Sequence, residues 1–130
     1  MKNYLILLLT LLIIGCSDDD TPQIQDTGLN GSWTLTNVIC FCGFPDPPGF
    51  EQTQLNFDLA NAQIRVDRSG TGLEYFRPVG TYNFLGTDNT ITLEDGRAYT
   101  YTIEGNVLRL DFVDEPQIAD DEITFLLSRN

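Results

Sequence analysis

The chain has 130 residues, and nineteen acidic side chains against seven basic ones give it a formal net charge of −12 at pH 7. A protein this acidic is repelled by phosphate backbones and anionic lipid heads, which excludes nucleic acid as a partner. The sequence holds no histidine, so a Ser-His or Cys-His nucleophile and an imidazole base are excluded as well.

The first fifteen residues have the pattern of a signal peptide. Lys2 precedes an apolar run over residues 4–14 that is interrupted only by Thr10. This run suits the hydrophobic region of a signal peptide and is well short of the roughly 20 residues that a transmembrane helix needs. Residues 13–16, Ile-Ile-Gly-Cys, resemble the bacterial lipobox. The resemblance implies cleavage before Cys16, diacylglycerol on its sulfur and acylation, for example with palmitate, of the new amino group.

An acidic segment follows Cys16. Residues 17–20, Ser-Asp-Asp-Asp, resemble the export signal of Bacteroidota-type lipoproteins that are displayed on the outer membrane. The alternative is that the aspartates only solvate a tether. Residues 16–30 have little apolar content, so we expect a lipidated, flexible tether there. We therefore expect a protein held in the outer membrane by lipid, at the cell surface or on the periplasmic face.

From residue 31 onward, apolar and polar residues alternate in short runs separated by turn residues, which is typical of antiparallel strands. No stretch has a convincing helical stripe. Turn sequences at 86–89, 94–96 and 104–106 favour hairpins. The predicted strands are residues 32–39, 52–59, 62–67, 79–85, 90–94, 97–104, 106–113 and 121–128.

Eight sequential strands predict an all-β domain over residues 31–130, folded as a small eight-stranded antiparallel up-and-down barrel. Closure into a barrel removes the exposed edges that an open sheet would present. Residues 29–35 contain Gly31-Ser32-Trp33, which resembles the Gly-x-Trp first strand of lipocalin-like (calycin) barrels. The resemblance implies that Trp33 lies over the closed end and that Arg129, from the last strand, stacks on it. Both residues would then be structural; the alternative is that Trp33 is an ordinary core aromatic.

An eight-stranded barrel is either filled by its own side chains or accepts one small molecule. Many large rings are expected to face inward, which favours a filled barrel because protein interiors are densely packed. These inward candidates are Trp33, Phe57, Tyr82, Phe84, Tyr99, Tyr101, Phe112 and Phe125.

Residues 39–52 form an unusual connection, with three prolines and two glycines that prevent regular structure. Phe41, Phe44 and Phe50 are too apolar for a plain solvated loop. In lipocalin-like barrels the first long loop covers the open end. The segment is therefore either a lid or docking surface for a ligand or partner, or a plug whose phenylalanines complete the core.

Cys40 and Cys42 are the two cysteines left once Cys16 carries lipid. Outside the cytoplasm we expect them to form a disulfide that stiffens the loop. Metal binding is the weaker alternative, because two thiolates without histidine make an incomplete zinc site. We expect neither a metal nor a cofactor.

The remaining polar residues do not suggest catalysis. The glycines of residues 68–72 precede no helix, so a phosphate site is not expected. Six acids near the end of the chain match no calcium loop and are expected to form a solvated face: Asp111, Asp114, Glu115, Asp120, Asp121 and Glu122. The sequence thus predicts a monomeric, non-enzymatic binding domain on a lipid anchor, with a small apolar molecule as the expected ligand. The alternative is an interaction subunit or inhibitor of an envelope protein that acts through residues 39–52.

Overall fold

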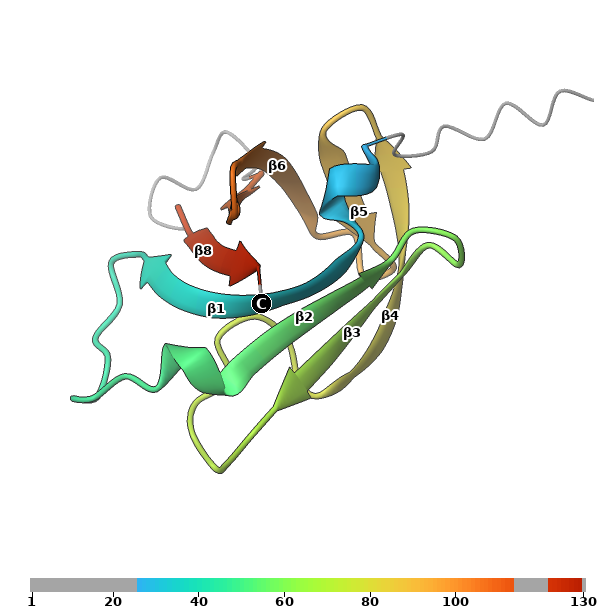
Figure 1. Cartoon of the computed structure of the whole chain (residues 1–130). Coiled ribbons are helices and arrows are strands. Elements are labelled where there is room, and N and C mark those ends of the chain that lie inside the picture. Colours follow the sequence, from blue (N-terminus) through green and yellow to red (C-terminus); the bar gives the residue numbers. More distant parts are fainter. Residues whose placement is uncertain (1–25, 114–121, 130) are drawn as a thin grey trace, which may run out of the picture.

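The computed structural model describes residues 26–113 and 122–129, which form a closed antiparallel barrel (Figure 1). Each strand pairs with the next in sequence, and the last pairs with the first. The strands are β1 (Gly31–Ile39), β2 (Thr53–Asp58), β3 (Gln63–Arg68), β4 (Gly80–Thr87), β5 (Thr90–Leu93), β6 (Ala98–Glu104), β7 (Val107–Phe112) and β8 (Thr124–Arg129). The predicted fold class is confirmed, and every predicted strand is present with its ends displaced by a few residues.

The two ends of the barrel differ in their connections. Tight turns join β2 to β3, β4 to β5 and β6 to β7 at one end, which we call the closed end. Asp88 and Gly105 adopt positive φ angles in two of these turns, a conformation that Asp and Gly tolerate better than most residues. The longer connections, residues 40–52 and 69–79, lie at the other end, together with the β5–β6 turn, the end of β7 and the start of β8. We call this the open end.

Aliphatic side chains fill the middle of the barrel. They come from the inward positions of successive strands, as the period of two requires. The fully buried members are Leu35, Leu55, Ile64, Val66, Ile91, Leu108, Leu110 and Leu127. Of the predicted inward rings, Tyr82 and Phe112 are only half-buried, and the others are buried. The barrel is therefore filled through its centre, and its large rings lie toward the ends.

A short 3-10 helix, η1 (Thr27–Leu29), covers the closed end. Leu29 is fully buried, and its carbonyl oxygen accepts a hydrogen bond of 2.9 Å from the indole Nε1 of Trp33. The Arg129 guanidinium lies 4.3 Å from the centroid of the Trp33 ring and donates to the carbonyl oxygens of Gly28 and Asn30. The packed residues therefore include η1, which precedes Gly31.

The described residues contain a complete core and a sheet in which every strand has a neighbour on both sides. These are the properties of a domain that folds independently. Among the described residues there is no helix with the length and hydropathy needed to cross a membrane.

Candidate ligand-binding site

A pocket of about 280 Å³ lies at the open end, between the 69–79 connection and the adjacent ends of β6, β7 and β8. It is only partly enclosed, so a small molecule has a way in from solvent. Its walls are mainly aromatic and are formed by Tyr75, Phe76, Arg97, Tyr99, Phe112, Ile123 and Phe125.

Strand register brings these rings together. Tyr99 of β6 lies opposite Phe112 of β7, and Phe125 of β8 lies opposite Leu110 of β7. Phe76, from the 69–79 connection, packs onto them with ring centroids 5.2 Å from Tyr99 and 5.3 Å from Phe125. Tilted and edge-on ring contacts of this length are the favoured aromatic geometry. The pocket therefore has a wall of mutually supported rings.

The 40–52 connection packs against Tyr75, which is part of this wall. Phe50, which begins the 3-10 helix η2 (Phe50–Gln52), is buried, and its ring lies 4.7 Å from Tyr75 and 5.2 Å from Phe44. The Tyr75 hydroxyl donates to the carbonyl oxygen of Pro48. Phe44 and Phe50 thus occupy the inward position of a plug, and Tyr75 links them to the pocket.

Phe41 behaves differently from the other two phenylalanines. Its side chain is 94% exposed, and it lies between Cys40 and Cys42, which are joined by a disulfide. The three phenylalanines that the sequence grouped as one candidate surface are therefore separated in the structure. Their role in binding stays a prediction.

Two arginines share one carboxylate beside the pocket. Asp95 Oδ2 lies 2.6 Å from Arg77 Nη2 and 3.8 Å from Arg97 Nε, while Asp95 Oδ1 accepts from the backbone N–H of Arg97 at 3.0 Å. Burial raises the pKa of the Tyr99 hydroxyl, and the charge and hydrogen bond of Arg97 only partly offset this effect. The hydroxyl is therefore protonated at neutral pH, next to a guanidinium that also lines the pocket.

Several buried polar atoms at the open end lack a hydrogen-bond partner. Within the described residues these atoms are Gln52 Oε1, Thr53 Oγ1, Arg68 Nε and Nη1, and Arg77 Nε. The acid nearest to Arg68 is Glu74, at 3.7 Å, which is too long for a hydrogen bond. Buried donors without partners are rare and costly, and they mark places where water or a ligand belongs.

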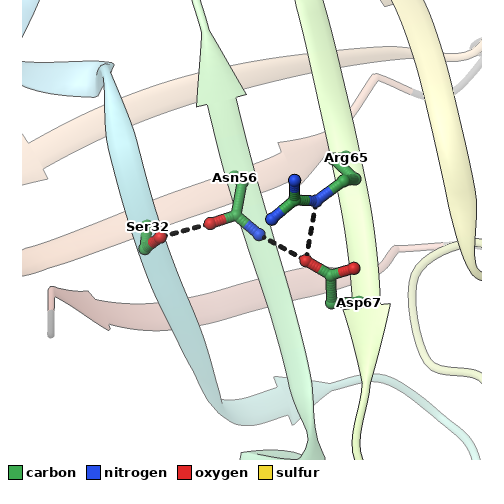
Figure 2. Close-up of polar contacts among 4 residues, drawn as sticks. All are labelled: Ser32, Asn56, Arg65 and Asp67. Carbon is green, nitrogen blue, oxygen red and sulfur yellow. Dashed lines mark hydrogen bonds and ion pairs between the residues drawn. The ribbon is translucent and has the colours of Figure 1, made fainter.

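A polar network crosses the outer face of β1, β2 and β3 (Figure 2). Ser32 donates to Asn56, whose Nδ2 donates to Asp67 at 2.8 Å, and Arg65 Nε also donates to Asp67 at 2.9 Å. A hollow of about 260 Å³ lies beside it. Because these groups satisfy one another, we interpret the network as a link between strands and not as a binding site.

The other predicted site residues lie away from the pocket or outside the described residues. Trp33 and Arg129 stack at the closed end, away from the pocket. Cys16 lies outside the described residues, as do Asp114, Glu115, Asp120 and Asp121. In the described part of the chain, no three His, Cys, Asp or Glu side chains gather closely enough to hold a metal ion.

Sequence reasoning missed Tyr75, Phe76 and Arg97. The signal that could have pointed to the first two is a pair of aromatic residues shortly before Pro78, in a connection that otherwise reads as solvated. Comparison of the chain with known protein families, with curated proteins and with solved structures found no match.

Proposed function

We propose that this protein is a lipid-anchored cell-envelope lipoprotein whose lipocalin-like barrel binds a small apolar ligand at its open end, without catalysis. The observation that supports the binding role most directly is the aromatic pocket of about 280 Å³, at the mouth of a barrel that is otherwise filled. The mouths of β-barrels are common positions for ligand sites, which are usually concave and mostly apolar.

The size of the pocket limits the ligand. A protein cavity of about 150 Å³ accommodates benzene, and pockets for drug-sized ligands have volumes of about 300 Å³ or more. A pocket of about 280 Å³ therefore suits a molecule with one or two rings, or a branched alkyl chain of similar volume.

The proposed anchor is lipid on Cys16, with the domain held at the outer membrane, on the cell surface or the periplasmic face. The lipobox resemblance of residues 13–16 and the acidic segment that follows Cys16 support this. We further propose that the protein is a monomer, without cofactor, and that its contact with the membrane is made through the lipid.

A second candidate function is an interaction subunit or inhibitor that docks an envelope protein through the 39–52 connection. Phe41 is almost fully exposed and its neighbour Ile39 is half-exposed. Exposed aromatic side chains held on a stiff turn are typical anchors of protein interfaces.

Native mass spectrometry of residues 17–130, produced in an oxidising periplasm, tests the ligand proposal. We expect a species heavier than the chain that reverts to the bare mass in organic solvent. Ile123→Trp should fill the pocket and remove the added mass. Leu126→Trp, on the outward side of β8, is the matched control and should retain it.

A bare chain in the unmodified protein would contradict the ligand proposal. In that case, a protein that is captured by the parent chain and lost with Phe41→Ser would favour the interaction role.

A further inference from the structure

The charged groups at the open end indicate what kind of ligand the pocket takes. Both carboxylate oxygens of Asp95 already have a partner, because Oδ2 makes the short contact with Arg77 and Oδ1 accepts from the backbone N–H of Arg97. Arg97 Nε is 3.8 Å from that carboxylate, beyond hydrogen-bond distance. Two guanidinium groups therefore face one carboxylate, and the one that lines the pocket, Arg97, makes only the long contact with it.

Of the arginines at the open end, Arg97 is the one that lines the pocket, whereas Arg68 and Arg77 are not among the pocket residues. Donors on a charged group form their strongest hydrogen bonds with anions. A carboxylate in the pocket would therefore accept from Arg97.

The pocket wall adds a hydroxyl donor. Tyr99 is buried and protonated at neutral pH, and it lies beside Arg97. A guanidinium and a neutral hydroxyl side by side form a pair that suits a carboxylate, because both donate and neither repels it.

The rings define the other half of the ligand. Phe76, Phe112 and Phe125 line the same pocket as Arg97, and Tyr99 contacts all three, with ring centroids 5.2 to 6.1 Å away. An aromatic guest gains more from such a wall than an alkyl chain of equal area, because rings add edge-to-face contacts.

We infer that the ligand is a small aromatic carboxylate, whose ring lies among Phe76, Phe112 and Phe125 and whose carboxylate accepts hydrogen bonds from Arg97 and Tyr99. This inference rests on the proposed function. The net charge of −12 opposes an anionic ligand, but only at long range. The Debye length is about 8 Å at physiological ionic strength, so most distant acids are screened while Arg97 acts in contact.

The test compares 3-phenylpropanoate with 3-phenylpropan-1-ol, which share a ring and chain and differ in charge. Calorimetric titration of residues 17–130 should show the acid binding at least about tenfold more tightly than the alcohol, as expected for a charge-assisted contact. Arg97→Gln should lower the affinity for the acid to that for the alcohol and leave the affinity for the alcohol unchanged. Tyr99→Phe should lower the affinity for the acid by a few fold and leave the affinity for the alcohol unchanged.

Arg109→Gln is the matched control. The Arg109 and Arg97 side chains are 51% and 53% exposed, and each has its Nε near an aspartate two residues away. Because Arg109 lies on the outward side of β7, its loss should leave both affinities unchanged.

Three results would overturn the inference. Equal binding of acid and alcohol to the parent chain would show that the pocket takes neutral ligands and leave the proposed function intact. Binding of neither probe would count against both this inference and the proposed function. Equal losses of affinity for the acid in Arg97→Gln and Arg109→Gln would show that the arginine charge acts from a distance and not at the pocket.

Discussion

Trp33 and Arg129 close one end of the barrel through three kinds of contact. The indole ring is buried, its N–H donates to Leu29, and its face carries the Arg129 guanidinium. The same guanidinium binds two carbonyl oxygens, those of Gly28 and Asn30. One side chain from the last strand therefore fixes both the first strand and the 3-10 helix before it.

Replacing Arg129 with methionine keeps an apolar stem but removes the charge and the donors. We expect the free energy of unfolding to fall by about 2 kcal/mol, from the lost cation-π contact and charged hydrogen bonds. Urea denaturation measures the loss. Arg65→Met, which breaks an exposed pair with Asp67, should cost less than about 1 kcal/mol. Equal losses in the two variants would contradict this role for Arg129.

Asp111 contributes stability that depends on pH. Its carboxylate accepts from Arg109 Nε at 2.7 Å and from Thr124 Oγ1 at 2.6 Å, which links β7 to β8. The hydrogen bond from Arg109 lowers the pKa of Asp111; burial opposes this, and the Thr124 hydrogen bond and the Arg109 charge add to the lowering. Because the folded pKa is below the unfolded one, the stabilisation is complete above the ordinary Asp range and is lost as pH falls through the folded pKa.

We therefore expect Asp111→Asn to lower the free energy of unfolding at pH 7 by at most about 1 kcal/mol, since the side chain is 36% exposed and solvent screens the pair. Urea denaturation at several pH values should show the gap between parent and variant narrowing below about pH 4. A gap of the same size at pH 7 and pH 3 would contradict the assignment.

The 40–52 connection places its phenylalanines in two different environments. Its second half packs Phe44 and Phe50 against Tyr75, whereas its first half exposes Phe41 on a turn closed by the Cys40–Cys42 disulfide. The sequence shows three phenylalanines among prolines and glycines, and nothing in their spacing separates the buried from the exposed. That difference depends on Tyr75, which is distant in sequence and reaches Phe44 and Phe50 from the connection between β3 and β4.

A pair of substitutions separates the two halves of this connection. Phe50→Ala should lower the free energy of unfolding by about 3 kcal/mol, because a buried ring is removed and its cavity remains. Phe41→Ala should change it by less than about 0.5 kcal/mol, as expected for an exposed side chain. Thermal or urea denaturation of both variants gives the comparison. A small loss for Phe50→Ala would show that the loop does not act as a plug.

For the whole molecule, the fold was predictable and the pocket was not. Strand alternation is local, so Leu108 and Leu110 indicate an inward face without knowledge of their neighbours. The pocket depends on register and on a connection that crosses the barrel mouth. Phe76 has no alternating neighbours that mark it as buried, and Arg97 acquires its significance only from Asp95, Arg77 and Tyr99. Such contacts are set by closure of the barrel and not by the sequence around each residue.

The two ends of the barrel also differ in what they carry. η1, at the start of the described chain, lies at the closed end, and the pocket lies at the open end. If lipid on Cys16 anchors the protein as we propose, the anchor attaches to the end opposite the pocket. The mouth is then free to face away from the membrane and to meet ligands in solution.

Pairing of β1 with β8 has a consequence for how the molecule is made. The first strand to leave the ribosome, or to cross a membrane, receives its second neighbour only when the last strand arrives. Until then β1 and β7 each have an unpaired edge, Trp33 lacks Arg129, and the pocket lacks Phe125. Contacts so distant in sequence form slowly. A chain exported from its N-terminus would therefore stay open during transit and gain both the Arg129 contact and the pocket in one final step.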